Sequence, residues 1–165
     1  MTPLDLSEEE ATAYHEAGHA VMGCLLDRRP LRVDILPDSC GNVGHTKFPD
    51  DFHEYEERNS DDQKKIAYVE TRVLIEVAGT IAHDFKCPTR NLDSGDKHDE
   101  YIARELIECI QVTNREELFK SLRRRAKELI FEHWAWVDGI ARTLVEKKEL
   151  DGSQLPELRP LAGSK

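Results

Sequence analysis

The chain has 165 residues, of which 39% are hydrophobic and 34% charged, so it can form one domain with a substantial core. Its formal net charge of −10 argues against nucleic-acid binding, because neutralising phosphates requires an excess of Lys and Arg. No apolar run is long enough to span a bilayer and residues 1–5 lack signal-peptide features, so we expect a cytoplasmic protein without membrane contact.

The first predicted helix covers residues 8–27. Ser7 followed by Glu10 is the pattern of a capping box, and Pro30 cannot easily continue the helix. Apolar or small residues recur along it at helical spacing: Tyr14, Gly18, Val21 and Leu25. Glycine costs about 1 kcal/mol relative to alanine inside a helix, so we expect another backbone to approach Gly18 closely.

Two short strands are predicted next. Residues 31–35 alternate between apolar and polar side chains, which is the period of a half-buried strand, and a turn-rich stretch leads to a second strand at 43–48. Residues 49–62 are acidic and without period, which predicts a surface loop.

The remainder of the chain is predicted to be helical. One helix begins at a second capping box, Ser60 with Gln63, and carries an apolar face: Ile66, Val69, Val73, Val77 and Ile81. A second helix is expected from about Asp96 to Gln111.

The last helical region is predicted to begin at an Asn114 cap and to reach about Glu149, with a bend near residues 133–134. Asp151-Gly152 is expected to stop it, and an extended tail should follow from Gln154. The predicted fold class is mainly α with a small β-hairpin or sheet, organised as one domain over residues 1–152 and a tail over 153–165.

Four cysteines are spaced too widely for a paired metal or redox motif. In a reducing compartment such residues are most simply small core residues, so we expect this role for all of them: Cys24, Cys40, Cys87 and Cys109.

The segment His15-Glu16-Ala17-Gly18-His19 carries the clearest chemistry. Its two histidines are four residues apart, so on a helix they share one face and both imidazoles can reach one tetrahedral zinc ion. Glu16 can reach a zinc-activated water without binding the metal, which suits a general base. We therefore predict a Zn²⁺ site with His15 and His19 as ligands and Glu16 as the catalytic residue.

A chance match is the alternative, because three fixed residues define this motif and unrelated helices contain it by coincidence. The surroundings favour a functional motif. The two histidines neighbour Tyr14, Gly18 and Val21 on the side of the helix that faces the core. Two buried imidazoles without a partner would be energetically costly, and a metal ion satisfies both.

Asp99 is the candidate third ligand, because a catalytic zinc usually has three protein ligands and one open position. In the helix expected from Asp96, it shares a face with Ala103, Leu106 and Ile110. An unpaired carboxylate at the head of an apolar stripe is unfavourable. Asp96 has the character of an N-cap, and the alternative for Asp99 is also a capping role.

These segments together resemble the proteolytic domain of the FtsH-type zinc peptidases, which is usually fused to a AAA ATPase. The helix segment 14–20 is the most specific match. Further regions are similar in the same order along the chain: 33–37 with 44–46, 76–82, and Ser94-Gly95 with His98-Asp99. The last of these is similar to the family's Ser-Gly-x-x-Asn-Asp segment, whose final aspartate is a zinc ligand. The resemblance thus implies Asp99 as the third ligand and a helical zincin domain with endopeptidase activity.

The chain also departs from the family pattern. It contains no Gly-rich phosphate loop, ATPase module or transmembrane helix, and His98 replaces the usual asparagine. ATP-driven unfolding and a hexameric ring are therefore not part of the expectation.

The predicted function is that of a zinc-dependent endopeptidase acting on peptides or unfolded proteins, with substrate pairing along residues 43–48. Three histidines could assist at the oxyanion, although supporting or surface roles suit each better: His45, His53 and His98. Two alternatives remain open. The chain could be a catalytically silent domain that binds a protein partner, in which case a fourth ligand such as His98 would indicate structural zinc. It could also serve a separate ATPase as its peptidase subunit, and a homo-oligomer is compatible with all three.

Overall fold

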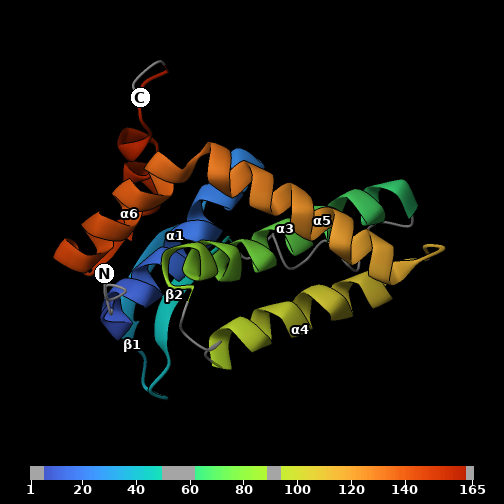
Figure 1. Ribbon diagram of the computed structural model, residues 1–165, viewed down its shortest axis with the longest axis horizontal. Helices are drawn as coiled ribbons and strands as arrows, with labels where there is room; N and C mark the ends of the chain where they lie inside the picture. The colour runs from blue at the N-terminus through green and yellow to red at the C-terminus, as the bar shows by residue number, and fades with distance from the viewer. Residues whose placement is uncertain (1–5, 50–61, 89–93, 163–165) are drawn as a thin grey trace.

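The computed structural model describes residues 6–49, 62–88 and 94–162, and helices make up most of this part of the chain (Figure 1). The α-helices in chain order are α1 (Glu8–Leu25), α3 (Asp62–Lys86), α4 (Ser94–Glu108), α5 (Arg115–Glu132) and α6 (Trp134–Lys147). The strands are β1 (Arg32–Pro37), β2 (Val43–Lys47) and β3 (Glu149–Asp151), followed by the short 3-10 helices η2 (Gly152–Gln154) and η3 (Pro156–Leu158). The fold is mainly α with a small sheet, as the sequence predicts.

Helix α1 lies at the centre of the core. It contacts α3, α6 and the strands β1 and β2, and Figure 1 shows it crossing the molecule behind α5 and α6. Ala17 and Val21 on α1 are fully buried, as are Val73 on α3 and Ile140 on α6. A helix enclosed in this way holds any polar side chain at its buried face in a fixed place.

The helix boundaries follow local capping chemistry. The Ser7 hydroxyl accepts a hydrogen bond from the Glu10 N–H at 3.2 Å, and the Glu10 carboxylate accepts one from the Ser7 N–H at 3.0 Å, so the predicted capping box is confirmed. The Asn114 side chain caps α5 through the Glu117 N–H at 3.1 Å. The bend expected near residues 133–134 is a break between α5 and α6 at His133. Ser60 lies outside the described residues.

The sheet has the strand order β2-β1-β3, and both pairings are antiparallel. Val33 on β1 stands opposite Thr46 on β2 and Leu150 on β3. Val33 and Leu150 are buried, so the middle and last strands contribute to the core, while β2 forms one edge of the sheet.

The third strand corrects the expectation of a helix reaching Glu149. Helix α6 ends at Lys147, because Lys148 has a φ of 71° in the left-handed region and its N–H bonds back to the Leu144 carbonyl. Asp151-Gly152 therefore ends a strand rather than a helix. A three-residue strand has no periodicity of its own, and only its pairing with β1 makes it a strand.

The expectation of an extended tail from Gln154 is wrong for the residues up to Leu158, which form η2 and η3. Leu155 is fully buried, and the Trp136 indole N–H donates to its carbonyl at 2.9 Å. Burial of one leucine side chain stabilises the fold by about 1.5–3 kcal/mol, so packing can fix this segment although its sequence has no regular pattern.

Helix α4 begins at Ser94, two residues before the expected start. Asp96 therefore lies inside the helix and is not its N-cap.

The expectation for the cysteines holds in part. Cys87 is buried and Cys24 packs against the core from a half-buried position. Cys40 and Cys109 are exposed, so the prediction of a core role is wrong for these two. Single cysteines carry no periodic pattern of their own, and their burial depends on how the surrounding elements pack.

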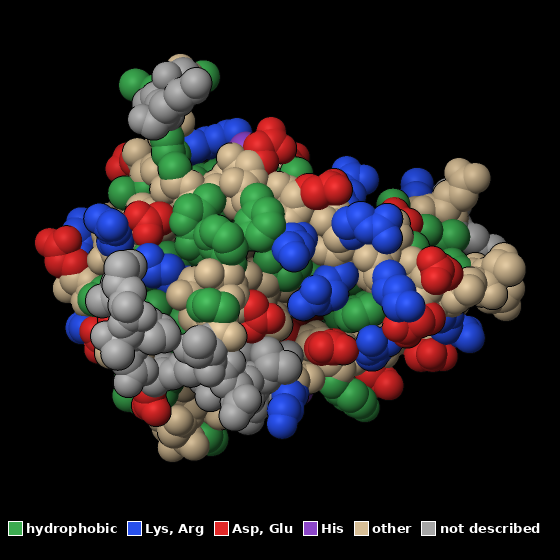
Figure 2. Space-filling model, in the orientation of Figure 1, with side chains coloured by type: hydrophobic (Ala, Val, Ile, Leu, Met, Phe, Trp, Pro, Cys, Tyr) green, Lys and Arg blue, Asp and Glu red, His purple; other side chains and the backbone are tan. Residues whose placement is uncertain are grey.

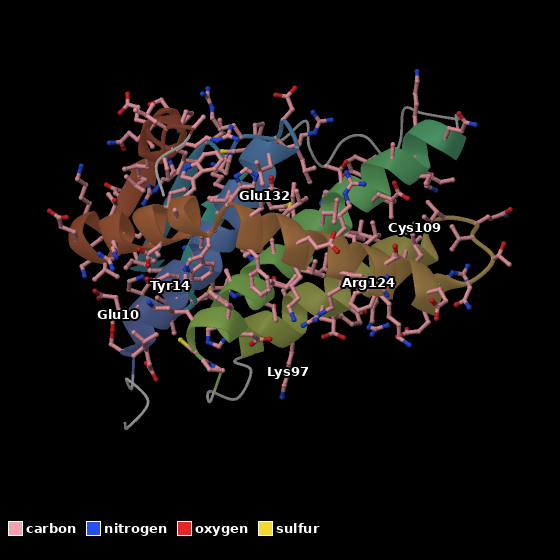
Figure 3. All side chains as sticks on the ribbon, turned by 45° about the horizontal axis from the view of Figure 1, so that its top comes forward. Glu10, Tyr14, Lys97, Cys109, Arg124 and Glu132 are labelled. Carbon is pink, nitrogen blue, oxygen red and sulfur yellow. The ribbon has the colours of Figure 1, made fainter. Side chains whose placement is uncertain are left out.

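Helix α5 presents cations to solvent. Figure 2 shows Lys and Arg side chains gathered along it, and Arg124, labelled in Figure 3, and Arg125 are both exposed. Trp134 at the start of α6 packs against Phe85, with ring centroids 4.4 Å apart.

In the described ranges no helix combines the length and apolar character that crossing a bilayer requires.

Gly18 lies at a close approach of α1 and α3, as its helix-interior position predicts. A Cβ atom there would lie 2.4 Å from the Ala78 carbonyl oxygen and 2.8 Å from the Ala82 Cβ. Backbone cannot withdraw as a flexible side chain can, so the two helices would have to separate.

We expect Gly18→Ala to lower the free energy of unfolding by about 1–3 kcal/mol in urea denaturation, because it overpacks this crossing. Gly139→Ala is the matched control, since a Cβ there meets only the Leu158 carbonyl oxygen at 3.7 Å. That change should stabilise α6 by up to about 1 kcal/mol. Equal effects of the two substitutions would contradict the close crossing.

Candidate metal centre and active site

Helix α1 presents the motif on the side away from α6. Tyr14, labelled in Figure 3, points towards α6, where its ring stacks on Trp134 with centroids 5.7 Å apart. His15 and His19 follow on the same helix with ring centroids 4.7 Å apart and edge-on to one another. Their Nε2 atoms are 3.0 Å apart, so the spacing brings both ring nitrogens to one point.

Asp99 reaches the same point from α4. Its Oδ2 lies 2.9 Å from the His15 Nε2 and 3.1 Å from the His19 Nε2, and 15% of its side chain is exposed. Ala103 and Leu106 on its helix face are buried, which confirms the predicted inward stripe. Because Asp99 is inside α4 and not at its start, the capping alternative is excluded.

The orientation of His19 is fixed from α3. Its Nδ1 lies 2.8 Å from the Ile75 carbonyl oxygen, and a carbonyl only accepts hydrogen bonds, so Nδ1 carries the proton. In the neutral ring, Nε2 then directs a lone pair towards His15 and Asp99. This is the tautomer that metal binding through Nε2 requires.

Gly79, one turn after Ile75, leaves the space that the His19 ring occupies. A Cβ at Gly79 would lie 2.3 Å from the His19 Nε2 and 2.7 Å from its Cε1. Helix α3 therefore positions His19 in two ways. The Ile75 carbonyl accepts its hydrogen bond, and Gly79, one turn later, leaves room for its ring.

The charges at this point are strongly coupled. Burial alone would raise the pKa of the Asp99 carboxyl, but hydrogen bonds from His15 and His19 and their charges outweigh burial and hold that pKa well below its usual range. Burial lowers the pKa of His19, whereas its hydrogen bond to Asp99 has the opposite effect, and the net pKa is raised. A carboxylate facing two imidazoles attracts a cation, either a proton or a metal ion.

The donor set fits zinc. Neighbouring ligand atoms of a tetrahedral zinc with bonds of about 2.0–2.1 Å are about 3.3 Å apart, and the three atoms here are separated by 2.9–3.1 Å. Two imidazole nitrogens and one carboxylate oxygen are ligands that zinc accepts. Among the described residues, one group of His, Cys, Asp or Glu side chains is compact enough to hold a metal ion. It consists of His15, His19 and Asp99.

Glu16 lies beside this cluster and is only 6% exposed. Its Oε2 accepts a hydrogen bond from the Thr46 hydroxyl on β2 at 2.6 Å. An open cleft runs past it, lined by side chains of α1, β2, α3 and α4, among them His15, Glu16, Thr46, Arg72 and Asp99.

The other histidines named by the sequence have separate surroundings. On the cleft wall, the His45 Nδ1 lies 3.1 Å from the Asp34 carboxylate. Burial lowers the pKa of His45, but hydrogen bonds and charges, chiefly of Asp34, outweigh it and leave that pKa raised. His98 is exposed and outside the cluster of ligand atoms, and His53 lies outside the described residues.

Three residues of this site were not predicted. The Ile75 carbonyl, which accepts the hydrogen bond from His19, is a main-chain group and leaves no signal in the sequence. Gly79 does leave one, because a glycine inside a helix is as unfavourable there as at Gly18. Thr46 follows Gly44 at the interval of two that places residues on one face of a strand.

The sequence of the chain is similar to those of zinc metalloproteases. Over 93% of its length, the chain is 24% identical to the ATP-dependent zinc metalloprotease FTSH 1, chloroplastic, of Arabidopsis thaliana, and 23% identical to the ATP-dependent zinc metalloprotease FtsH 3 of Synechocystis. Over 62% of its length, it is 30% identical to the chloroplastic FTSH 1 of Oryza sativa subsp. japonica. The chain covers 27%, 31% and 16% of these relatives, respectively. No family model matches it.

Proposed function

This chain is homologous to the FtsH zinc metalloproteases, and on that premise we propose that it is a zinc-dependent endopeptidase for peptides and unfolded protein segments. The supporting observation is the convergence of the His15 and His19 Nε2 atoms with the Asp99 Oδ2, beside the Glu16 carboxylate in an open cleft. Three ligands leave the fourth position that a catalytic zinc needs.

The roles of the residues follow from their placement. A zinc ion held by His15, His19 and Asp99 supplies Lewis acidity at the scissile carbonyl and lowers the pKa of water. Glu16 takes a proton from the water whose oxygen attacks the carbonyl carbon. As the C–N bond breaks, Glu16 gives that proton to the leaving amine, so the products are a carboxylic acid and an amine, and the acid then loses its proton to the amine, leaving a carboxylate and an ammonium group.

Strand β2 is the proposed guide for the substrate. It is an edge of the described sheet, and its residues 43–47 line the same cleft as Glu16. An extended peptide can add to such an edge through main-chain hydrogen bonds, which are indifferent to side-chain identity. The net charge of −10 favours basic peptides at long range.

The purified chain is expected to hold one zinc ion and to cleave a reduced, alkylated protein, with the activity lost in a chelator and restored by added zinc. Metal analysis and gel-based proteolysis measure both. Chelation should also lower the free energy of unfolding, by about 2.7 kcal/mol if free zinc had been at 100 times its Kd.

The alternatives give different results in the same assay. Bound zinc without any hydrolysis would favour a silent, partner-binding domain. Cleavage of a folded protein only after an ATPase and ATP have been added to the assay would indicate a peptidase subunit of a separate ATPase, since the relatives are named ATP-dependent. Hydrolysis that persists in the chelator at the full rate would overturn the zinc mechanism.

A further inference from the structure

Strand β2 holds the carboxylate of Glu16. The Thr46 hydroxyl donates to the Glu16 Oε2 at 2.6 Å and lies 3.3 Å from the Glu16 main-chain carbonyl. The shorter contact has the length of a hydrogen bond from a hydroxyl to a carboxylate, and hydrogen bonds of this kind are about twice as strong as neutral ones. Because Glu16 is almost completely buried, few solvent molecules compete for that oxygen.

Gly44, two residues earlier on the same strand, gives the carboxylate its space. It has a φ of +87°, and a Cβ there would lie 2.8 Å from the Glu16 Oε1 and 3.1 Å from its Cγ. Thr12 is closer still, with its Cγ2 at 2.6 Å from that position. The strand thus approaches α1 so closely that only a residue without a side chain fits.

We propose that Thr46 is a positioning residue for Glu16, which rests on the proposed peptidase function and adds a residue to its machinery. A glutamate side chain has three rotatable bonds, and a general base acts only within hydrogen-bond reach of the proton it takes. Thr46 restrains the carboxylate at one oxygen, and Gly44 leaves room for the other. His45 does not do this, because its imidazole is paired with Asp34.

The activity test compares Thr46→Val, which removes the hydroxyl at nearly constant shape, with Thr46→Ser, which keeps it. Thr46→Val should lower kcat by about 10-fold to 100-fold, as expected for lost support of a catalytic group, with KM and zinc content unchanged. Thr46→Ser should stay within about threefold of the parent. If the valine variant does not fold, Thr46→Ala replaces it under the same criteria.

A second measurement needs no metal and no activity. In chelator, the unfolding equilibria of Thr46→Val, Glu16→Ala and the double variant form a cycle that isolates the hydrogen bond. We expect a coupling of about tenfold in the unfolding constant. Thr143→Val is the matched control, because its hydroxyl bonds to the Gly139 carbonyl within α6, and it should be additive with Glu16→Ala.

The outcomes separate the two proposals. No coupling in the metal-free cycle, or a Thr46→Val variant as active as an active parent, overturns the positioning role. An inactive parent protein with clear coupling overturns the peptidase function, while the Thr46–Glu16 contact stands.

Discussion

Glu16→Gln is expected to lower the rate of peptide hydrolysis by about 10²-fold to 10⁴-fold while the protein still binds one zinc ion. The glutamine amide has the shape of the carboxylate and its oxygen can still accept from Thr46, but it cannot take a proton from water. Glu16 is next to the proposed ligand His15 and is not in the group of side chains that could hold a metal ion, so metal affinity should change little.

Kinetics on an unfolded substrate and metal analysis of the same samples check this expectation. Glu128→Gln makes the same chemical change at an exposed position of α5, so it should leave both readings unaltered. A Glu16→Gln variant that cleaves as fast as the parent would show that another group takes the proton, whereas loss of zinc would show that Glu16 supports the metal.

Gly79→Ala should weaken zinc binding by about 100-fold, the upper end of the effect of changes behind a ligand. The new methyl group would occupy the place of the His19 ring, 2.3 Å from the Nε2 that faces His15 and Asp99. Alanine is otherwise a better helix former than glycine by about 1 kcal/mol, so α3 itself should not be weakened.

Zinc competition with a chromogenic chelator gives the affinity, and far-UV circular dichroism checks that the helices remain. Gly139→Ala repeats the substitution in α6, where the nearest foreign atom would be 3.7 Å away, and should bind zinc like the parent. An unchanged affinity in Gly79→Ala would mean that His19 is not a ligand or that its ring can turn without loss.

Much of the local structure was predictable from neighbouring residues. The Ser7 capping box and the break at His133 depend on contacts within one or two helical turns, which the sequence displays directly. The inward orientation of Asp99 was predictable for a related reason, since its apolar neighbours repeat at helical spacing along one helix face.

The parts that were not predictable depend on partners far away in the chain. Strand β3 exists because three residues after α6 pair with β1, and Leu155 is buried because Trp136 and its surroundings provide a place for it. Neither segment is long enough to carry a periodic pattern, so its conformation follows from packing rather than from local preference.

In the candidate site, too, local contacts were predictable and contacts between distant parts of the chain were not. The sequence by itself determined that His15, Glu16 and His19 share one turn of a buried helix, because a spacing of four residues is a property of the helix alone. Only the tertiary structure decided that Asp99 meets them from α4, that the Ile75 carbonyl selects the tautomer of His19, and that Thr46 holds Glu16. These contacts join residues 30 to 84 positions apart, and such distances are closed by the packing of whole helices and strands, which no short sequence pattern encodes.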